Sequence, residues 1–382
     1  MQNRRSSHTR RALALVAMGI LALSSTAFAE DDKGSTSFWE KTKVTGSFDA
    51  SYNWNFNNPP LGAAAIPFRA GANNTLRVFD NQHNNFEFNF AEVAIENSPA
   101  DWAKFRLDLN FGEDVAVVDS LKGGVIGIDE FGVQQAYADL TANVGNGLTF
   151  RVGHFVTPIG YEVIESAYNL NFSRSILFGF AIPFTHTGVT MTYPFSDKFT
   201  GMIGVVNGWD VVGDNNKGKT ILGQLVYKPI NTLTLSLQGT FGPEQGGSDG
   251  NLRGVIDFVG TWTPNDKWIV GLNYDLGKEE GIGGGGFANW QGVAGYVHFK
   301  PWDSVGFTLR GEFFQDDGSR LLLGPSATVG EGTLTTHFYL SDGWETRIEF
   351  RHDQADRAAF LKSDGTGRKF QDTIAAEVVY AF

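Results

Sequence analysis

The sequence predicts an all-β fold: a transmembrane, antiparallel, up-and-down β-barrel of about 16 strands. Three observations support this prediction. Many segments alternate strictly between apolar and polar side chains, long and short connections follow one another in turn, and the chain opens with an export signal. No window after residue 30 is apolar enough for a membrane helix, so a membrane protein of this sequence must cross with closed strands.

The first 29 residues have the composition of a secretory signal peptide. Four arginines precede an apolar stretch at 12–25, and Ala27-Phe28-Ala29 gives a small-residue cleavage pattern. We therefore expect a signal peptide at 1–29, a short periplasmic segment at 30–43 and a barrel domain at 44–382. Cleavage would remove four arginines and no acid, which takes the formal net charge from −12 to −16. Such an acidic chain argues against nucleic-acid binding.

The composition also favours one exported membrane domain. Cysteine is absent, which excludes disulfides, thiolate metal sites and a nucleophilic thiol. Glycine is frequent, aromatic residues make up 13%, and charged residues make up only 19%. No stretch resembles a linker between soluble domains.

The segment 44–56, VTGSFDASYNWNF, shows the strand pattern best. Its even-numbered residues are apolar or glycine and its odd-numbered residues are all polar, and a period of two defines an extended strand. One face suits lipid and the other suits water. The same alternation recurs at 103–111, 233–241 and 344–351. For any one segment, a half-buried strand of a soluble sheet is the alternative.

Three segments are patterned less clearly. In 86–95 the apolar phase shifts, and we expect a β-bulge near Ala91-Glu92. The apolar faces of 133–140 and 290–299 are ambiguous. A barrel of 14 or 18 strands therefore stays open.

The connections sort into two length classes that alternate along the chain. This is the asymmetry of outer-membrane barrels, in which short turns are periplasmic and long loops are external, so both chain ends are expected in the periplasm. The short connections are 97–100, 142–147, 194–198, 228–231, 263–267, 300–304 and 341–343, and the long ones are 57–82, 112–131, 156–185, 208–219, 242–250, 277–289, 315–332 and 353–369.

The last segment, 369–382, alternates up to its final residue. We expect it to pair with 44–56 and close the ring, since lipid does not tolerate an open strand edge. The terminal Phe382 also resembles the C-terminal signature of barrels that are handed to the barrel assembly machinery, which is therefore an expected partner.

Several long motifs resemble the OmpL-like β-barrel porins, the beta-barrel porin 2 family. They are RVFDNQHNNFEFNFAEVAIE (77–96), FRLDLNFG (105–112), HFVTPIGYEVIES (154–166), NFSRSILFGFAIPFTHTGV (171–189), GVVNGWDVVGDNNKGKT (204–220), GPEQ (242–245) and RGEFF (310–314). The resemblance covers nearly the whole mature chain. It implies a porin of the Gram-negative outer membrane and brings no particular substrate with it.

Sorting the strand residues by face predicts the charges of the lumen. Basic and acidic groups nearly balance, so the wall itself predicts only mild ion selectivity, while the acidic loops favour cations. The predicted lumen residues are Lys104, Arg106, Arg151, Arg253, Arg310, Arg347 and Arg351 on the basic side, and Asp49, Asp108, Asp257, Asp275, Glu312, Glu345, Glu349 and Glu377 on the acidic side.

The segment 155–185 differs from the other long loops, because it is rich in large apolar side chains that a solvent-exposed loop would not keep. Our hypothesis is that it folds into the lumen and narrows the pore, with Glu162, Glu165 and Arg174 as the charges of the constriction. The alternatives are that it covers a barrel mouth or contacts a neighbouring subunit.

Other sites are weaker candidates. Segment 213–220 matches the phosphate-loop pattern GxxxxGKT, but a strand pattern follows it instead of a helix, so we interpret it as a solvated loop. The seven histidines show no metal-ligand spacing. A lipid-hydrolysing barrel is the alternative function, with Ser166, Ser173 or Ser175, a glutamate, and His154 or His186, although no nucleophile-elbow pattern is present.

The predicted function is therefore that of a porin, which lets small hydrophilic solutes and ions diffuse passively through the outer membrane. No catalytic residue, cofactor or metal is expected. Outer-membrane lipid surrounds the barrel, and a homotrimer is left open. A soluble exported β protein is the remaining alternative.

Overall fold

The computed structural model describes residues 38–60, 73–121, 127–128, 131–282, 285–321, 323–324 and 326–382. The expected signal peptide lies outside these residues. Thr42–Phe382 form one compact unit, and the short 3-10 helix η1 belongs to a separate one. The elements are η1 (Phe38–Lys41), β1 (Thr42–Asn55), β2 (Asn85–Ala100), β3 (Ala103–Phe111), α2 (Glu113–Leu121), β4 (Gly127–Ile128), β5 (Phe131–Ala142), β6 (Leu148–Val156), η2 (Ser166–Tyr168), η3 (Leu177–Ala181), β7 (Thr185–Ser196), β8 (Phe199–Val206), β9 (Thr220–Ile230), β10 (Leu233–Pro243), β11 (Leu252–Asn265), β12 (Trp268–Ile282), β13 (Gly286–Trp302), β14 (Val305–Asp316), β15 (Ala327–Tyr339), β16 (Trp344–Ala355), β17 (Phe360–Leu361), β18 (Gly367–Arg368) and β19 (Phe370–Ala381).

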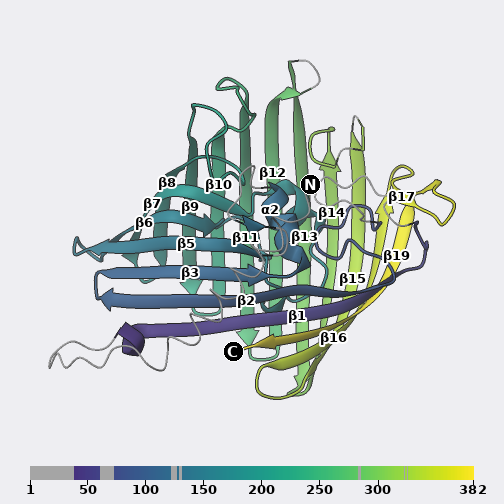
Figure 1. The fold of residues 1–382 in the computed structure, drawn as a ribbon, viewed down its shortest axis with the longest axis horizontal. Helices are drawn as coiled ribbons and strands as arrows, with labels where there is room; N and C mark the ends of the chain where they lie inside the picture. Colours follow the sequence, from purple (N-terminus) through teal and green to yellow (C-terminus); the bar gives the residue numbers. More distant parts are fainter. Residues whose placement is uncertain are drawn as a thin grey trace, which may run out of the picture. The chain divides into compact units, whose positions relative to one another are not determined.

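Sixteen of the described strands form a closed antiparallel ring (Figure 1). Each long strand pairs with the next one along the chain, and β19 pairs with β1 in a register that sets Phe48 opposite Tyr380. The two-residue strand β4 pairs only with β5, and β17 and β18 form a small separate hairpin. The predicted barrel, its strand count and its closure by the last segment are confirmed.

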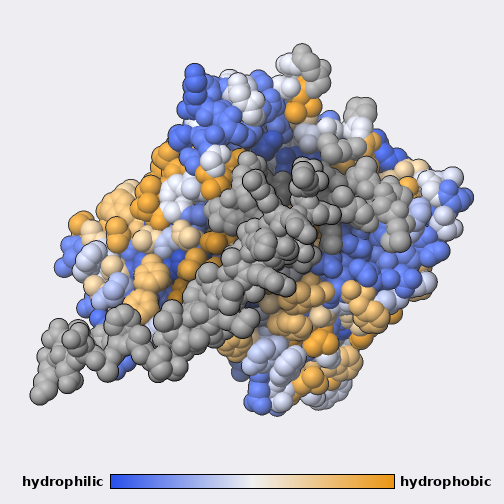
Figure 2. Space-filling view, in the orientation of Figure 1, coloured by the Kyte–Doolittle hydropathy of each residue, from blue (hydrophilic) through white to orange (hydrophobic). Residues whose placement is uncertain are grey.

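The two faces of the ring differ in polarity as the alternation predicts. In β16, Phe350 is 44% exposed on the outer face while the adjacent Glu349 is 3% exposed on the inner one. In β1, Asp49 and Asn53 are likewise buried inside. Figure 2 shows hydrophobic residues gathered over the strand wall, while the hairpins at the top of the view are mainly hydrophilic. An apolar exterior with a polar interior suits a barrel that stands in a bilayer.

The predicted bulge in β2 is confirmed, but it lies at Asn89, two residues before the expected Ala91-Glu92. Asp49 of β1 is opposite Phe90 and the next residue, Ala50, is opposite Phe88, so Asn89 is the extra residue. Phe90 is consequently buried inside the ring, whereas its apolar character suggested the lipid face. The carbonyl oxygen of Asn89 lies close to Gly112, where an added Cβ would come within 2.5 Å of it.

Two connections differ from the prediction. The segment 277–289 is mostly strand, because β12 and β13 continue beyond the wall as one hairpin. The segment 112–131 contains the helix α2, whose first turn holds Glu113 and Asp114, acidic residues that favour a helix N-terminus. None of the helices in the described residues is long and apolar enough to cross a membrane.

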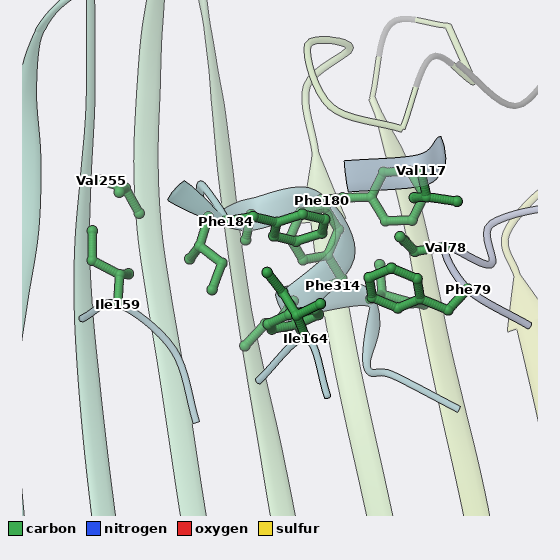
Figure 3. Packing of buried hydrophobic residues seen from close by; sticks show 14 of the residues in the cluster. Val78, Phe79, Val117, Ile159, Ile164, Phe180, Phe184, Val255 and Phe314 are labelled. Carbon is green, nitrogen blue, oxygen red and sulfur yellow. The ribbon is translucent and has the colours of Figure 1, made fainter. Parts of the chain in front are cut away.

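An apolar cluster lies inside the ring, where a water-filled tube would have none. It joins residues of the first long loop, α2 and the segment between β6 and β7, and it reaches wall residues such as Phe314. Phe178 stacks on Phe184 at 4.8 Å between ring centroids, and Phe79 lies 6.0 Å from Phe184. Figure 3 shows Val78, Phe79, Val117, Phe180 and Phe184 gathered at this place. These loops therefore fold inward and pack on one another as the core of a soluble domain does.

Candidate functional site in the barrel lumen

The segment between β6 and β7 lies inside the barrel and reaches the opposite wall. We call residues 157–184 the lumen loop. Its first turn contacts β11 and β12: Gly160 donates its backbone N–H to Asp257 at 3.1 Å, and Tyr161 donates to Asn273 at 3.2 Å. Gly160 has φ +98°, and Gly271 lies beneath the Tyr161 ring at a place where a Cβ would come within 2.5 Å. Glycine at both positions therefore lets the loop lie against the wall.

Wall carboxylates accept hydrogen bonds from pairs of backbone N–H groups in the lumen loop. Glu349 accepts from Phe172 at 2.8 Å and from Ser173 at 3.0 Å. Glu312 accepts from a second pair of N–H groups further along the loop, those of Ile176 at 2.7 Å and Leu177 at 2.5 Å. A loop without strand partners must satisfy its amides elsewhere, and charged acceptors are strong ones. These two glutamates thus fix the loop to β14 and β16.

Three arginines of the same wall donate hydrogen bonds to the lumen loop. Arg310 donates to Glu331 at 2.7 Å and to Glu162 of the loop at 2.8 Å. Arg347 donates to the carbonyl of Ser166 at 3.0 Å, and Arg351 donates to that of Arg174 at 2.6 Å. All three arginines are buried, so they hold the loop instead of facing open water.

The three residues expected at a constriction, Glu162, Glu165 and Arg174, all lie in the loop and are all buried. Glu162 accepts from Arg310 and from the Ser175 N–H at 2.7 Å. Glu165 accepts from Gln134, and its burial raises its pKa above the ordinary value. Arg174 donates to backbone carbonyls of its own loop, including that of Phe172 at 2.6 Å. In this structure their bonds stabilise the loop.

The predicted lumen charges divide into a buried and an exposed group. Asp257, Glu312, Arg310, Arg347, Glu349 and Arg351 lie behind the lumen loop, and Asp49, Asp275 and Glu377 are also buried. Lys104 and Arg151, by contrast, have side chains that are 37% and 33% exposed. They stand on β3 and β6, on the wall from which the loop departs.

The exposed group is arranged in cross-strand ion pairs. Lys104 lies 2.6 Å from Glu96, and Arg151 forms a two-pronged pair with Asp139 at 2.8 and 2.9 Å. Within β3, Arg106 is bonded to the buried Asp108, two residues along the same strand, at 2.8 Å. Arg253 pairs with Glu279, and Glu345 pairs with Arg347 and His337 at other places of the wall. Most of the predicted lumen charges are thus neutralised locally.

Arg77 is a buried residue of the lumen that the strand pattern could not reveal. It belongs to the first long loop and donates to Asp353 of β16 at 3.0 Å, besides its contact with Asp80. A strand-face analysis omits it because it stands in no strand. Its setting between apolar residues, Leu76 and Val78, is the sequence signal that could have singled it out.

The serines and the histidine that were considered as a hydrolytic site form hydrogen bonds with other groups. Ser166 donates to Glu377, Ser173 accepts from Arg310, and Ser175 accepts from the Phe178 N–H at 3.1 Å. His186 bonds to Thr157 at 3.1 Å and to the carbonyl of Gly208 at 3.0 Å. The phosphate-loop-like segment 213–220 leads into β9, a strand, as expected. In the part of the chain that the structure describes, no group of three or more acidic or histidine side chains could hold a metal ion.

Asp210 anchors the end of the lumen loop and makes a pH-dependent contribution to stability. It lies between β8 and β9 and accepts from the N–H groups of Phe184 at 2.7 Å and Thr185 at 2.9 Å. Burial raises its pKa from 3.8 to about 6. Between pH 3.8 and about 6, the carboxyl group of Asp210 therefore keeps its proton in the folded state and has lost it in the unfolded state. The stability that this proton contributes is lost as the pH rises through about 6.

We expect Asp210→Asn to remove that pH dependence while keeping the acceptor oxygen. The free energy of unfolding of the wild type, compared with the variant, should fall by up to about 3 kcal/mol between pH 4 and pH 7. Urea unfolding in detergent micelles at several pH values measures the difference, and other carboxyl groups cancel because both proteins contain them. Parallel curves for the two proteins would show that Asp210 does not titrate in this range.

The comparisons with known proteins agree with the geometry. Residues 41–382 match the family model described as "Putative beta-barrel porin-2, OmpL-like". OmpF of Salmonella typhi, in complex with daunomycin, has a TM-score of 0.60 at 10% identity, with 89% of this chain and 97% of that chain covered. OprB of Pseudomonas putida reaches 0.57 at 12% identity, with 94% and 100% covered. OmpT of Vibrio cholerae reaches 0.57 at 10% identity, with 93% and 100% covered.

At identities of 10–12%, the solved structures show the fold alone, whereas the family model shows to which family the chain belongs. The search of curated proteins returned no match. The match of the family model extends over every strand of the ring. The chain therefore belongs to the OmpL-like beta-barrel porin-2 family and is a porin of the outer membrane.

Proposed function

We propose that small hydrophilic solutes and ions diffuse passively between the lumen loop and the wall formed by β3, β5 and β6. The supporting observation is the contrast between two sets of inward charges. The Arg310 side chain is 0% exposed behind the loop, whereas the side chains of Lys104 and Arg151 on the other wall are 37% and 33% exposed. Exposed ion pairs in a lumen indicate where water is present. Passage by this route needs no chemical step.

The charges of this route support weak selectivity. Each exposed base stands beside an acid, as in the pairs Lys104–Glu96 and Arg151–Asp139, so neither sign dominates. A ring of one sign would be needed for strong selection. The net negative charge of the chain, −12 before any cleavage, adds a mild preference for cations.

The assembly we propose is a homotrimer that reaches the outer membrane after cleavage of the signal peptide at 1–29. OmpT of Vibrio cholerae, which shares the fold, is described in a trimer form. Phe382 exchanges two backbone hydrogen bonds with Gly46 of β1, at 3.0 and 3.1 Å, so the last residue takes part in ring closure.

Planar-bilayer recording tests the proposed function. We expect the purified barrel to give stepwise currents with a small reversal potential of cation sign in a salt gradient. Arg151→Gln leaves the charge of Asp139 unbalanced in the passage and should shift the reversal potential further toward cations. Arg357→Gln removes the same charge from the external loop between β16 and β19, outside the strand wall, and should shift the reversal potential less. A folded barrel without stepwise currents would overturn the proposal.

A further inference from the structure

Two arginines and two tryptophans form a cluster at the loop end of the barrel. Trp209 precedes β9 and Arg253 is in β11, while Trp290 is in β13 and Arg320 follows β14. The guanidinium carbons of Arg253 and Arg320 lie 5.1 and 4.8 Å from the centroid of the Trp209 ring. Arg320 also lies 5.3 Å from the Trp290 ring. Two positive groups thus share one aromatic surface, an arrangement that cation–π attraction allows.

Arg320 differs from the arginines that hold the lumen loop. Among the described residues, its bonds go through Nε alone, to the carbonyl of Phe180 at 2.7 Å, and it forms no ion pair. Both Nη groups, with four N–H donors, are left without a protein acceptor, whereas Arg310 uses Nε, Nη1 and Nη2. Burial and the neighbouring Arg253 lower the pKa of Arg320 to about 10. The Nε of Arg253 is also buried without a partner in the described chain.

The nearby carboxylates are occupied by other donors. Asp210 accepts from backbone N–H groups at the end of the lumen loop, and Glu244 accepts from the Trp209 N–H at 2.6 Å. Asp316 accepts from three successive N–H groups, those of Ser319, Arg320 and Leu321, at 3.0 to 3.1 Å. Glu279 pairs with Nη2 of Arg253. The charge of Arg320 is therefore surrounded by acids, yet none of these acids is bonded to its guanidinium.

The frame of the cluster is rigid. The indole N–H of Trp290 donates to the carbonyl of Ala181 at 3.1 Å, next to the carbonyl that Arg320 uses. Trp290 stands over Gly277, where any Cβ would come within 1.9 Å of the indole ring. Both contacts with the lumen loop are on η3, so the guanidinium of Arg320 is fixed relative to this loop. Donors that are fixed before a ligand arrives bind it with less loss of entropy.

We propose that Arg320 and Arg253, held over Trp209 and Trp290, bind the carboxylate or phosphate group of a small anionic solute at the loop end of the barrel. The planar fork of a guanidinium matches such an oxyanion with two parallel hydrogen bonds. The acceptor would satisfy the free Nη groups of Arg320, and the unpartnered Nε–H of Arg253 offers one further donor. This inference rests on the proposed function, because the solute reaches the site as cargo of the porin.

Binding is tested on the purified full barrel in detergent and in planar bilayers. Inorganic phosphate and acetate are added separately, with glucose as the neutral control, and calorimetry measures their affinity without requiring conduction. We expect one or both anions to bind and to lower the bilayer current, and Arg320→Gln to weaken binding about tenfold or more. Arg368→Gln is the matched control, since Arg368 also stacks on a ring, Phe370 at 3.5 Å, in another external loop.

The outcomes separate this inference from the proposed function. Stepwise currents without anion binding overturn the inference and leave the porin intact. Anion binding without currents supports the inference and overturns passive diffusion. Equal losses in Arg320→Gln and Arg368→Gln would show general surface attraction and contradict a site at the cluster. Arg320→Lys, which keeps the charge but loses the fork, should recover only part of the affinity if the geometry of the guanidinium matters.

Discussion

Deletion of Ile159–Gly179 is expected to raise the single-channel conductance several-fold. The ring is closed by strand pairing alone, since every long strand has two strand neighbours without the help of the loop. The deleted residues include the apolar centre of the lumen loop, with Phe172, Ile176 and Phe178 all buried inside the ring. Their removal replaces packed side chains by water over the width of the lumen. Single-channel recording of the deletion variant beside the wild type measures the change.

The deletion also uncovers charges that the loop now satisfies. Glu349 and Glu312 lose the backbone N–H groups that they accept from, and Arg310 loses Glu162. Water can solvate these groups once the lumen is open, so the ring should still form. The matched control is deletion of 246–249, at the tip of the hairpin between β10 and β11, which should leave the conductance unchanged. A folded deletion variant with wild-type conductance would exclude the loop as the limit to flow.

The fold could be predicted in detail because a strand of a membrane barrel has a different solvent on each face. The polarity of residues such as Phe350 and Glu349 therefore indicates whether they face lipid or the lumen. The length of a connection likewise indicates on which side of the membrane it lies. This reasoning gives the wrong face for Phe90. It is an apolar residue on the inner face, placed there by the bulge at Asn89. The alternation alone does not locate this bulge, because Phe90 continues the apolar run of Phe86 and Phe88.

The site was predictable in outline only. The excess of apolar residues in 155–185 indicated an inward loop, because such side chains need a dry partner surface. The partners themselves come from strands more than a hundred residues away, as in the contact between Glu162 and Arg310. Charges that would line an open tube are instead used to hold the loop. Composition cannot distinguish these two uses, because both require a charged side chain on the inner face.

Arg310→Met is expected to destabilise the barrel more than any single change of an exposed charge. Arg310 is fully buried and donates to Glu331, Glu162 and the carbonyl of Ser173. Methionine fills similar space but leaves Glu162 buried without its arginine and leaves Glu331 with only the more distant Arg351, at 3.7 Å. Breaking a buried ion pair costs about 3–5 kcal/mol. Urea unfolding of the barrel in detergent micelles, followed by far-UV circular dichroism, gives the change in the free energy of unfolding.

Lys104→Met is the matched control, because the same kind of charge is removed from an inward pair that water reaches. The Lys104–Glu96 pair is about one third exposed on both sides, and such pairs contribute about 0–1 kcal/mol. The two variants therefore separate charges that anchor the lumen loop from charges that line the passage. Combining Arg310→Met with Glu331→Gln should recover part of the loss, since one unpaired carboxylate is then neutral. Equal destabilisation by both single changes would mean that Arg310 is as well hydrated as Lys104, and the loop would then not seal that wall.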